Sequence, residues 1–189
     1  MRNVLQFIDT NLYNNGHDAI PEIQALRNVV ENNPWHKDQS VFVHTKNVVE
    51  ALQKYTKNEL LLLAALFHDI AKPKTFTRDR KTKMTLCVDH EKKSAEMMAE
   101  IGPKIGITGK DLKYVTTVIQ SHCLPALLLN ELLLGKSREK HSKEYFLKTG
   151  VFARDLLLHL LADMEGGDLA TLDPELFRKQ KEIIQNLLK

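Results

Sequence analysis

The sequence predicts an all-helical protein, because composition and patterning agree on that fold class. Glycine and proline are scarce, with 8 and 6 residues among 189, against an average of about 12% for the two combined. Apolar residues recur at helical spacing in almost every segment. A chain of this length buries roughly 70% of its unfolded surface. We therefore expect a single domain over residues 1–189, built as a bundle of about seven or eight helices.

Each expected helix is indicated by an apolar stripe or by a residue that favours a helix start. Apolar stripes run over residues 4–12 and 23–30, and the second follows Pro21, which suits a first helical turn. Ser, Asn, Thr and Asp are residue types that cap helices. They open four further expected helices: Ser40 to about Tyr55, Asn58 across Leu60–Ala71, Thr108 to Ser121, and Asp173 with Pro174 to the C-terminus.

Two stretches interrupt the helical pattern. Residues 72–89 combine Pro73 with charged and β-branched side chains, and residues 124–150 contain Pro125, Gly135 and the charged run KSREKHSKE. We expect loops or short irregular helices in both stretches. Loops of this length are either functional lids or disordered surface, and the sequence favours neither alternative.

Composition and charge exclude several classes of protein. The longest apolar run, Leu60–Phe67, has eight residues, whereas a membrane span needs about 20. The N-terminus lacks the continuous apolar region of a secretory signal, which predicts a cytoplasmic protein. Cys87 and Cys123 form no CxxC pair, so we expect free thiols. The net charge of +3 is interspersed along the chain and gives no support for a nucleic acid partner. The oligomeric state stays open.

Several histidines and aspartates fall on the apolar side of predicted helices. His44 is in register with an apolar stripe, His68 and Asp69 follow the longest apolar run, and His122 and Asp163 lie on two further stripes. No basic residue shares these stripes, and an isolated buried carboxylate is very costly. A lone histidine is more often an ordinary core residue, but that alternative leaves the two acids unexplained. Imidazoles and carboxylates turned inward from four helices predict a transition-metal site in the core.

The same residues carry a resemblance to a known family. The order His44, His68–Asp69, Asp163 resembles the H…HD…D signature of the HD superfamily of metal-dependent phosphohydrolases. The flanking segments SVFVHTKNVVEAL, LLLAALFHDIAKPKT and LLADMEGGD are similar as well. Within the superfamily, PWHKDQSVFVHT, HDIAKPKTF, VDHEKKSAEMM and VIQSHCLP look most like the HD domain of bacterial CCA-adding enzymes of tRNA. The resemblance covers about residues 33–168. The 189 residues carry no nucleotidyltransferase head, so we expect no nucleotide addition.

The resemblance implies a metal-ligand set, in which Asp69 bridges two ions. The first ion would be held by His44, His68, Asp69 and Asp163, and a second by His90 and His122 together with Asp69. Imidazoles and carboxylates suit Mn, Fe, Co, Ni or Zn, and Mg remains an alternative if water completes the second site. We therefore expect one or two divalent ions of unassigned identity.

The resemblance also implies substrate contacts. Lys72 follows the His-Asp pair by three residues, where HD proteins often place a lysine that meets the substrate phosphate, and its alternative is a solvated lysine at a helix end. Charge and nearness in sequence alone make Lys74 and Arg78 weaker candidates for the same contact. His36, which precedes the helix of His44, either lines the mouth of the site or is an ordinary loop residue.

Other conspicuous side chains are assigned to packing or to the surface. We favour a packing role for His159 over a hydrogen bond to a metal ligand, and we expect Trp35 and Tyr55 to pack rather than to stack on bases. His17 and His141 are expected to face solvent.

The expected activity is hydrolysis of a phosphomonoester or phosphodiester by metal-activated water, with Asp69 and Lys72 at the reacting centre. The resemblance favours a small nucleotide or nucleotide-derived substrate. The alternative is a non-catalytic module that binds metal and a nucleotide or RNA and regulates a partner.

Overall fold

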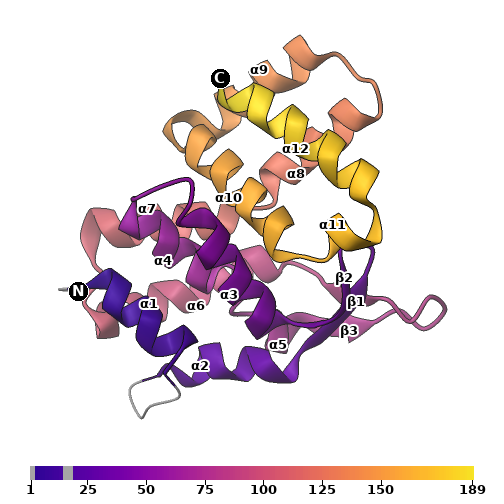
Figure 1. Cartoon of the computed structure of the whole chain (residues 1–189). Coiled ribbons are helices and arrows are strands. Elements are labelled where there is room, and N and C mark those ends of the chain that lie inside the picture. The colour runs from indigo at the N-terminus through magenta and orange to yellow at the C-terminus, as the bar shows by residue number, and fades with distance from the viewer. Residues whose placement is uncertain (1–2, 15–18) are drawn as a thin grey trace.

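Helices make up most of the computed structural model, which describes residues 3–14 and 19–189 (Figure 1). The prediction of an all-helical fold is confirmed. The described residues contain nine helices of nine or more residues, which are α1 (Val4–Leu12), α3 (Val41–Leu52), α4 (Glu59–Phe67), α6 (His90–Ile101), α7 (Gly109–Ser121), α8 (Leu124–Leu133), α9 (Arg138–Thr149), α10 (Ala153–Gly166) and α12 (Pro174–Leu188).

Shorter elements connect these helices. Three are single helical turns: α2 (Pro21–Gln24), α5 (Lys72–Thr75) and α11 (Leu169–Leu172). Three are 3₁₀ turns, at Ala25–Asn28, Gly102–Ile105 and Gly150–Phe152. Four strands form two antiparallel hairpins, β1 (Val30–Asn33) with β2 (His36–Ser40) and β3 (Phe76–Arg78) with β4 (Thr85–Cys87). Among the helices of the described ranges, none is both long and apolar enough to cross a membrane.

The predicted helix starts hold. The side chains of Ser40, Asn58 and Asp173 each accept a hydrogen bond from a backbone N–H of the first turn, and so cap α3, α4 and α12. Thr108 precedes α7 as predicted, although its side chain makes no capping hydrogen bond. The predicted ends of α3 and α4 are three to four residues too late, because the chain leaves each helix through a turn.

Both stretches predicted as irregular are ordered. Residues 72–89 form α5 and the β3–β4 hairpin, whose turn is closed by Asp79 Oδ1 accepting from the backbone N–H groups of Lys81 and Thr82. Residues 124–150 form α8 and α9, whose apolar side chains bury against α10 and α12. Pro125 is tolerated because it lies in the first turn of α8. Because α8 and α9 form where no long helix was predicted, the described residues contain nine long helices and not the predicted seven or eight.

The region 23–30 also departs from prediction, because a hairpin replaces the end of the expected helix. After α2 and a 3₁₀ turn the chain enters β1, which pairs with β2 through a register irregularity between Glu31 and Asn32. The Thr85 hydroxyl joins the two hairpins, since it accepts from the Asn32 backbone N–H at 3.0 Å. Apolar spacing over a few residues does not separate a short strand from a helix.

Helix α10 lies between α3 and α4 on one side and α8 and α12 on the other (Figure 1), and its apolar residues belong to two clusters. On one side, Leu156 and Ala162 pack with α3, α4, α6 and α7, and on the other, Leu157 and Leu161 pack with α8, α9 and α12. A helix with apolar contacts on both sides is buried over most of its circumference. The carboxylate of Asp163 is therefore delivered to the interior by a helix that has almost no polar face.

Helices α3 and α10 approach closely at Gly166. A Cβ atom at this position would lie 2.6 Å from Val48 Cγ2 and 2.9 Å from the Val48 backbone nitrogen. Because the nearest backbone atom belongs to α3 itself, a side chain here would push the two helices apart. This contact sets the separation of the helices that carry His44 and Asp163.

We expect Gly166→Ala to lower the free energy of unfolding by about 1–3 kcal/mol, because the helices must separate to admit one methyl group. Gly102→Ala is the matched comparison and should cost less, since its added carbon would meet the movable end of the Leu112 side chain. Urea denaturation of the two variants measures both effects. An unchanged unfolding midpoint for Gly166→Ala would contradict this account of the helix contact.

Candidate metal centre

The structure brings all six predicted metal ligands together. They come from five long helices and their ends: His44 in α3, His68 and Asp69 directly after α4, His90 at the start of α6, His122 after α7 and Asp163 in α10. All six line one cavity of about 580 Å³. The side chains of His90 and Asp163 are 16% and 31% exposed, whereas the other four residues are at most 5% exposed. The centre is therefore buried on the protein side and open on the cavity side.

The first group of ligands is His44, His68 and Asp163. His44 Nε2 lies 2.9 Å from Asp163 Oδ1, and His68 Nε2 lies 3.5 Å from the same oxygen and 3.1 Å from Asp69 Oδ2. His68 Nδ1 is 2.7 Å from the carbonyl oxygen of Ala65, so it must donate there. The Nε2 lone pair of neutral His68 therefore faces carboxylate oxygens, an arrangement that needs a cation.

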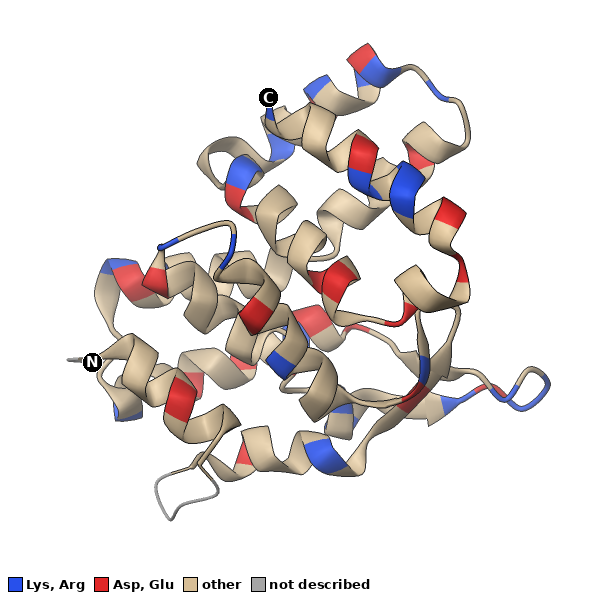
Figure 2. Ribbon diagram, in the orientation of Figure 1, with Lys and Arg blue, Asp and Glu red and all other residues tan. Residues whose placement is uncertain are grey.

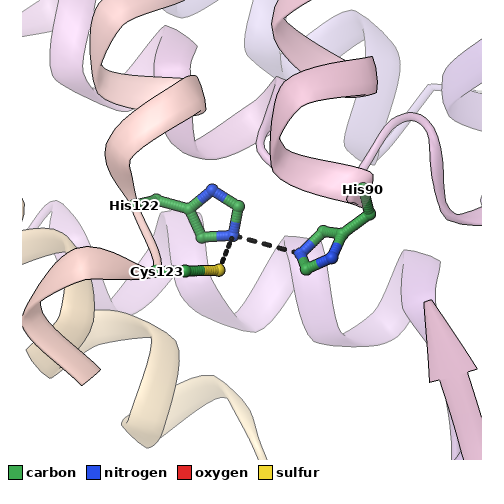
Figure 3. A group of neighbouring side chains, drawn as sticks. All are labelled: His90, His122 and Cys123. Carbon is green, nitrogen blue, oxygen red and sulfur yellow. Dashed lines mark hydrogen bonds between the residues drawn. The ribbon is translucent and has the colours of Figure 1, made fainter. Parts of the chain in front are cut away.

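The second group is His90, His122 and Cys123 (Figure 3). The Nε2 atoms of the two histidines are 3.3 Å apart, and Cys123 Sγ lies 3.5 Å from Nε2 of His122. Each histidine donates its Nδ1–H to a backbone carbonyl, that of Cys87 at 2.8 Å and that of Ile119 at 2.7 Å. These hydrogen bonds fix the ring orientation and leave both Nε2 atoms free to coordinate a metal.

Asp69 lies between the two groups. Its Oδ2 atom is 3.1 Å from His68 Nε2, and its Oδ1 atom is 3.3 Å from His90 Nε2. The residue is 1% exposed, and within the described chain neither carboxylate oxygen receives a hydrogen bond of normal geometry. One oxygen faces each group, which is the geometry of a bridging carboxylate.

Charges in the centre shift the pKa values of its members. Burial opposes protonation of His68, but Asp69 and Asp163 outweigh it and raise its pKa to about 10. Burial also opposes charge on His90, yet hydrogen bonding to Asp69 raises its pKa to about 9. Burial alone would raise the pKa of the two carboxyls, but the charge of His68 beside Asp69 and the hydrogen bond from His44 to Asp163 hold both well below the usual value. Protons thus supply positive charge in the metal-free site, and a metal must displace them.

The donor set fits a divalent transition metal. Imidazole nitrogens and carboxylate oxygens are suitable ligands for Mn, Fe, Co, Ni and Zn. A divalent ion would supply the positive charge that these facing acceptor atoms lack, and it would satisfy the buried oxygens of Asp69.

Lys72 corrects one premise of the sequence analysis, which placed no cation near the buried acids. Its ammonium lies 2.8 Å from Asp69 Oδ2 and 2.7 Å from Glu31 Oε2, and the residue is 7% exposed. The helical stripe did not include Lys72 because Lys72 opens the separate helical turn α5, three residues beyond Asp69. Lys72 lines the cavity, but it is an ion-paired residue rather than a solvated lysine.

The other predicted substrate residues differ in position. His36 is 8% exposed and lines the cavity. Its ring lies edge-on to that of His44, with 4.5 Å between the ring centroids, and its Nδ1 forms a hydrogen bond with Gln39 Oε1 at 2.8 Å. Burial, followed by the charge of His44, lowers the pKa of His36. Arg78 and Lys74 are not brought to the centre, since neither lines the cavity.

The remaining histidines are outside the ligand set. His159 is fully buried and contacts the rings of His68 and His122 at 5.1 and 5.6 Å, a packing arrangement in which burial lowers its pKa well below the usual value. The side chain of His141 is 21% exposed beside Glu144. His17 lies outside the described residues.

Sequence reasoning missed three residues that line the cavity. Glu31 is 4% exposed and pairs with Lys72, but it lies on β1, just beyond the helix expected over residues 23–30. Trp35 was assigned to packing but is 51% exposed at the cavity. Cys123 was considered only for disulfide and CxxC patterns, although its position directly after His122 was a signal for a place in the centre.

The comparison with protein families agrees with this geometry. A family model for the HD domain matches residues 41–140, which is more than half of the chain. The chain therefore belongs to the HD domain family, a family of metal-dependent phosphohydrolases. The match includes every predicted ligand except Asp163, which lies beyond its end.

A curated relative adds a second finding. The chain is 27% identical over 151 residues to the A-adding tRNA nucleotidyltransferase of Deinococcus radiodurans. The matched region is 78% of this chain and 32% of the relative, so the chain spans about a third of the length of the relative that it matches. Both findings confirm the resemblance predicted from the sequence.

The ion pairs of Lys72 generate a stability prediction. In metal-free protein, Lys72→Met would remove the ammonium that the buried carboxylates of Glu31 and Asp69 share, so we expect unfolding free energy to fall by about 3–5 kcal/mol. The double variant Lys72→Met, Glu31→Gln should recover part of this loss, because it removes one unpaired charge. Chemical denaturation in the presence of chelator measures both. A single variant as stable as the parent would contradict the buried ion-pair account.

Proposed function

We propose that the protein is a metal-dependent phosphohydrolase that cleaves a phosphomonoester or phosphodiester of a nucleotide or nucleotide-derived substrate. The observation that carries the proposal is the position of Asp69, with one carboxylate oxygen toward each of two ligand groups on the wall of an open cavity. Two ions held about 3.5–4 Å apart are a recurrent arrangement for phosphoryl chemistry.

The protein residues have distinct parts in this chemistry. Divalent ions bound here would supply an activated water and positive charge for phosphoryl transfer at neutral pH. His44, His68, Asp163 and their partners hold fixed donor atoms, so the centre needs little rearrangement when substrate enters. An ammonium group has three N–H donors, and Lys72 donates one to Glu31 Oε2 at 2.7 Å while it pairs with Asp69 through charge. The ammonium leaves a further N–H donor for a phosphate oxygen in the cavity that it lines.

The composition of the cavity supports a nucleotide substrate. Apolar side chains of Leu86, Met164 and Leu169 line it together with the amide groups of Asn130 and Gln180. Such a lining suits a flat base whose edge carries hydrogen-bonding groups.

Trp35 lines the same cavity with half of its surface exposed. The backbone N–H of Trp35 donates to Asn33 Oδ1 at 2.9 Å, and the carbonyl oxygen of Trp35 accepts from the backbone N–H of Asp168 at 2.8 Å. The exposed ring is therefore held on an anchored turn. An indole presented in this way can stack on a base. The tRNA relative gives the nucleotide assignment a second, independent support.

A regulatory, non-catalytic module is the competing function. One feature of the charge distribution supports the regulatory module. The tip of the β3–β4 hairpin is basic (Figure 2) and carries Arg78, Arg80, Lys81 and Lys83. Elsewhere on the ribbon Lys and Arg alternate with Asp and Glu (Figure 2). We favour the hydrolase because binding alone would not require two groups of donor atoms joined by a carboxylate.

Asp69→Asn tests the proposed function. Loss of the bridging charge should reduce hydrolysis to background and release bound metal, measured on nucleoside monophosphates, 2′,3′-cyclic nucleotides and dinucleoside polyphosphates with added Mn²⁺, Co²⁺ or Ni²⁺. Asp173→Asn is the control, because asparagine also caps a helix and Asp173 is exposed on α12. Hydrolysis by Asp69→Asn would contradict the proposal, and metal-loaded parent protein inactive on every substrate would favour the regulatory module.

Trp35→Ala tests the nucleotide assignment. Stacking of one base on an aromatic ring contributes about 1–3 kcal/mol, so kcat/KM for the best nucleotide should fall roughly 5- to 150-fold. Trp35→Phe should retain most of the activity. Glycerol phosphate, which has no base, should be hydrolysed equally by all three proteins. Equal losses on both substrates would assign Trp35 a structural role and contradict base stacking.

A further inference from the structure

Cys123 is a cavity-lining thiol that lies among the nitrogen donors of the second ligand group. Its Sγ atom and the donor atoms of His90 and His122 all lie within 4.8 Å of one another (Figure 3). The thiol is free, and its side chain points toward Nε2 of His122 at 3.5 Å (Figure 3). The three donors come from the start of α6 and from the junction of α7 and α8.

Asp69 offers a fourth donor next to His90. Asp69 Oδ1 lies 3.3 Å from His90 Nε2, is buried, and has no hydrogen-bond partner of normal geometry among the described residues. Two imidazole nitrogens, one thiolate sulfur and one carboxylate oxygen make a four-donor set of the kind that holds Zn²⁺ or a similar ion. The unsatisfied oxygen and the facing Nε2 atoms are independent signs that a cation belongs here.

Cys123 is the N-terminal cap of α8, a helix of ten residues. The proton of the thiol passes to the buffer when the metal binds, as coordination of cysteine requires.

We propose that the Cys123 thiolate is a ligand of the second metal ion, together with His90, His122 and Asp69. This assignment rests on the proposed function only for the presence of two ions. A thiolate ligand selects for soft or borderline ions, so the second position should prefer Zn²⁺, Co²⁺ or Fe²⁺ over Mg²⁺. The two positions of the centre therefore differ in donor type, one with nitrogen and oxygen donors and the other with sulfur as well.

Cobalt substitution tests this assignment directly. Metal-free parent protein titrated with Co²⁺ should take up two equivalents, and one of them should produce a sulfur-to-cobalt charge-transfer band in the near ultraviolet. Cys123→Ser should lose that band and bind the second equivalent more weakly, by at least the roughly 10- to 100-fold that loss of a ligand's hydrogen-bond partner costs. If the Cys123 thiol did not bind the metal, the parent protein would show no sulfur-to-cobalt band.

Cys87→Ala is the matched control. Cys87 also lines the cavity, but its sulfur lies outside the second group, and burial raises the pKa of its thiol to about 11. This variant should keep the band. X-ray absorption of the zinc-loaded parent protein needs no substitution, and it should show one sulfur neighbour at about 2.3 Å.

The outcomes separate this inference from the proposed function. Two equivalents of Co²⁺ without a sulfur band, or a band that survives in Cys123→Ser, would overturn the thiolate assignment while hydrolysis of nucleotides remained intact. A failure of the parent protein to bind any metal would overturn both. A band abolished by Cys123→Ser and retained by Cys87→Ala would establish the ligand.

Discussion

The buried carboxylate of Asp69 is the constraint on which the rest of the centre depends. An ionised carboxylate at 1% exposure is stable only if positive charge surrounds it. The chain meets this requirement with Lys72 on one side and with the imidazoles of His68 and His90 on the others. The apolar helix α4 delivers Asp69 to the interior, so the same residues that build the core also create the need for a cation.

Rigid supports hold the donor atoms in place. His68, His90 and His122 each bond a backbone carbonyl through Nδ1, which aims the opposite nitrogen at the centre. The close contact of α3 with α10 at Gly166 fixes the separation of His44 from Asp163. The centre is consequently formed by the packing of the helices, before any metal or substrate is added.

Sequence patterns predicted the parts of this account that depend on helical spacing. Inward stripes placed His44, His122 and Asp163 correctly, because a buried helix face is periodic. The partners from non-periodic segments were missed: Glu31 lies in a hairpin, and the chain reverses direction to bring it to Lys72. Exposure of Trp35 likewise depends on how its turn is anchored against the end of α10, which no local pattern encodes.

The most direct test of the central claim is elemental analysis of the purified, untagged protein by plasma mass spectrometry, which counts metal ions per chain. A centre bridged by a carboxylate should hold about two equivalents of a divalent transition metal after reconstitution with Mn, Fe, Co, Ni or Zn. One equivalent would contradict the bridging role of Asp69. No uptake would mean that protons and Lys72 satisfy the buried acids, and it would contradict the metal-centre account as a whole.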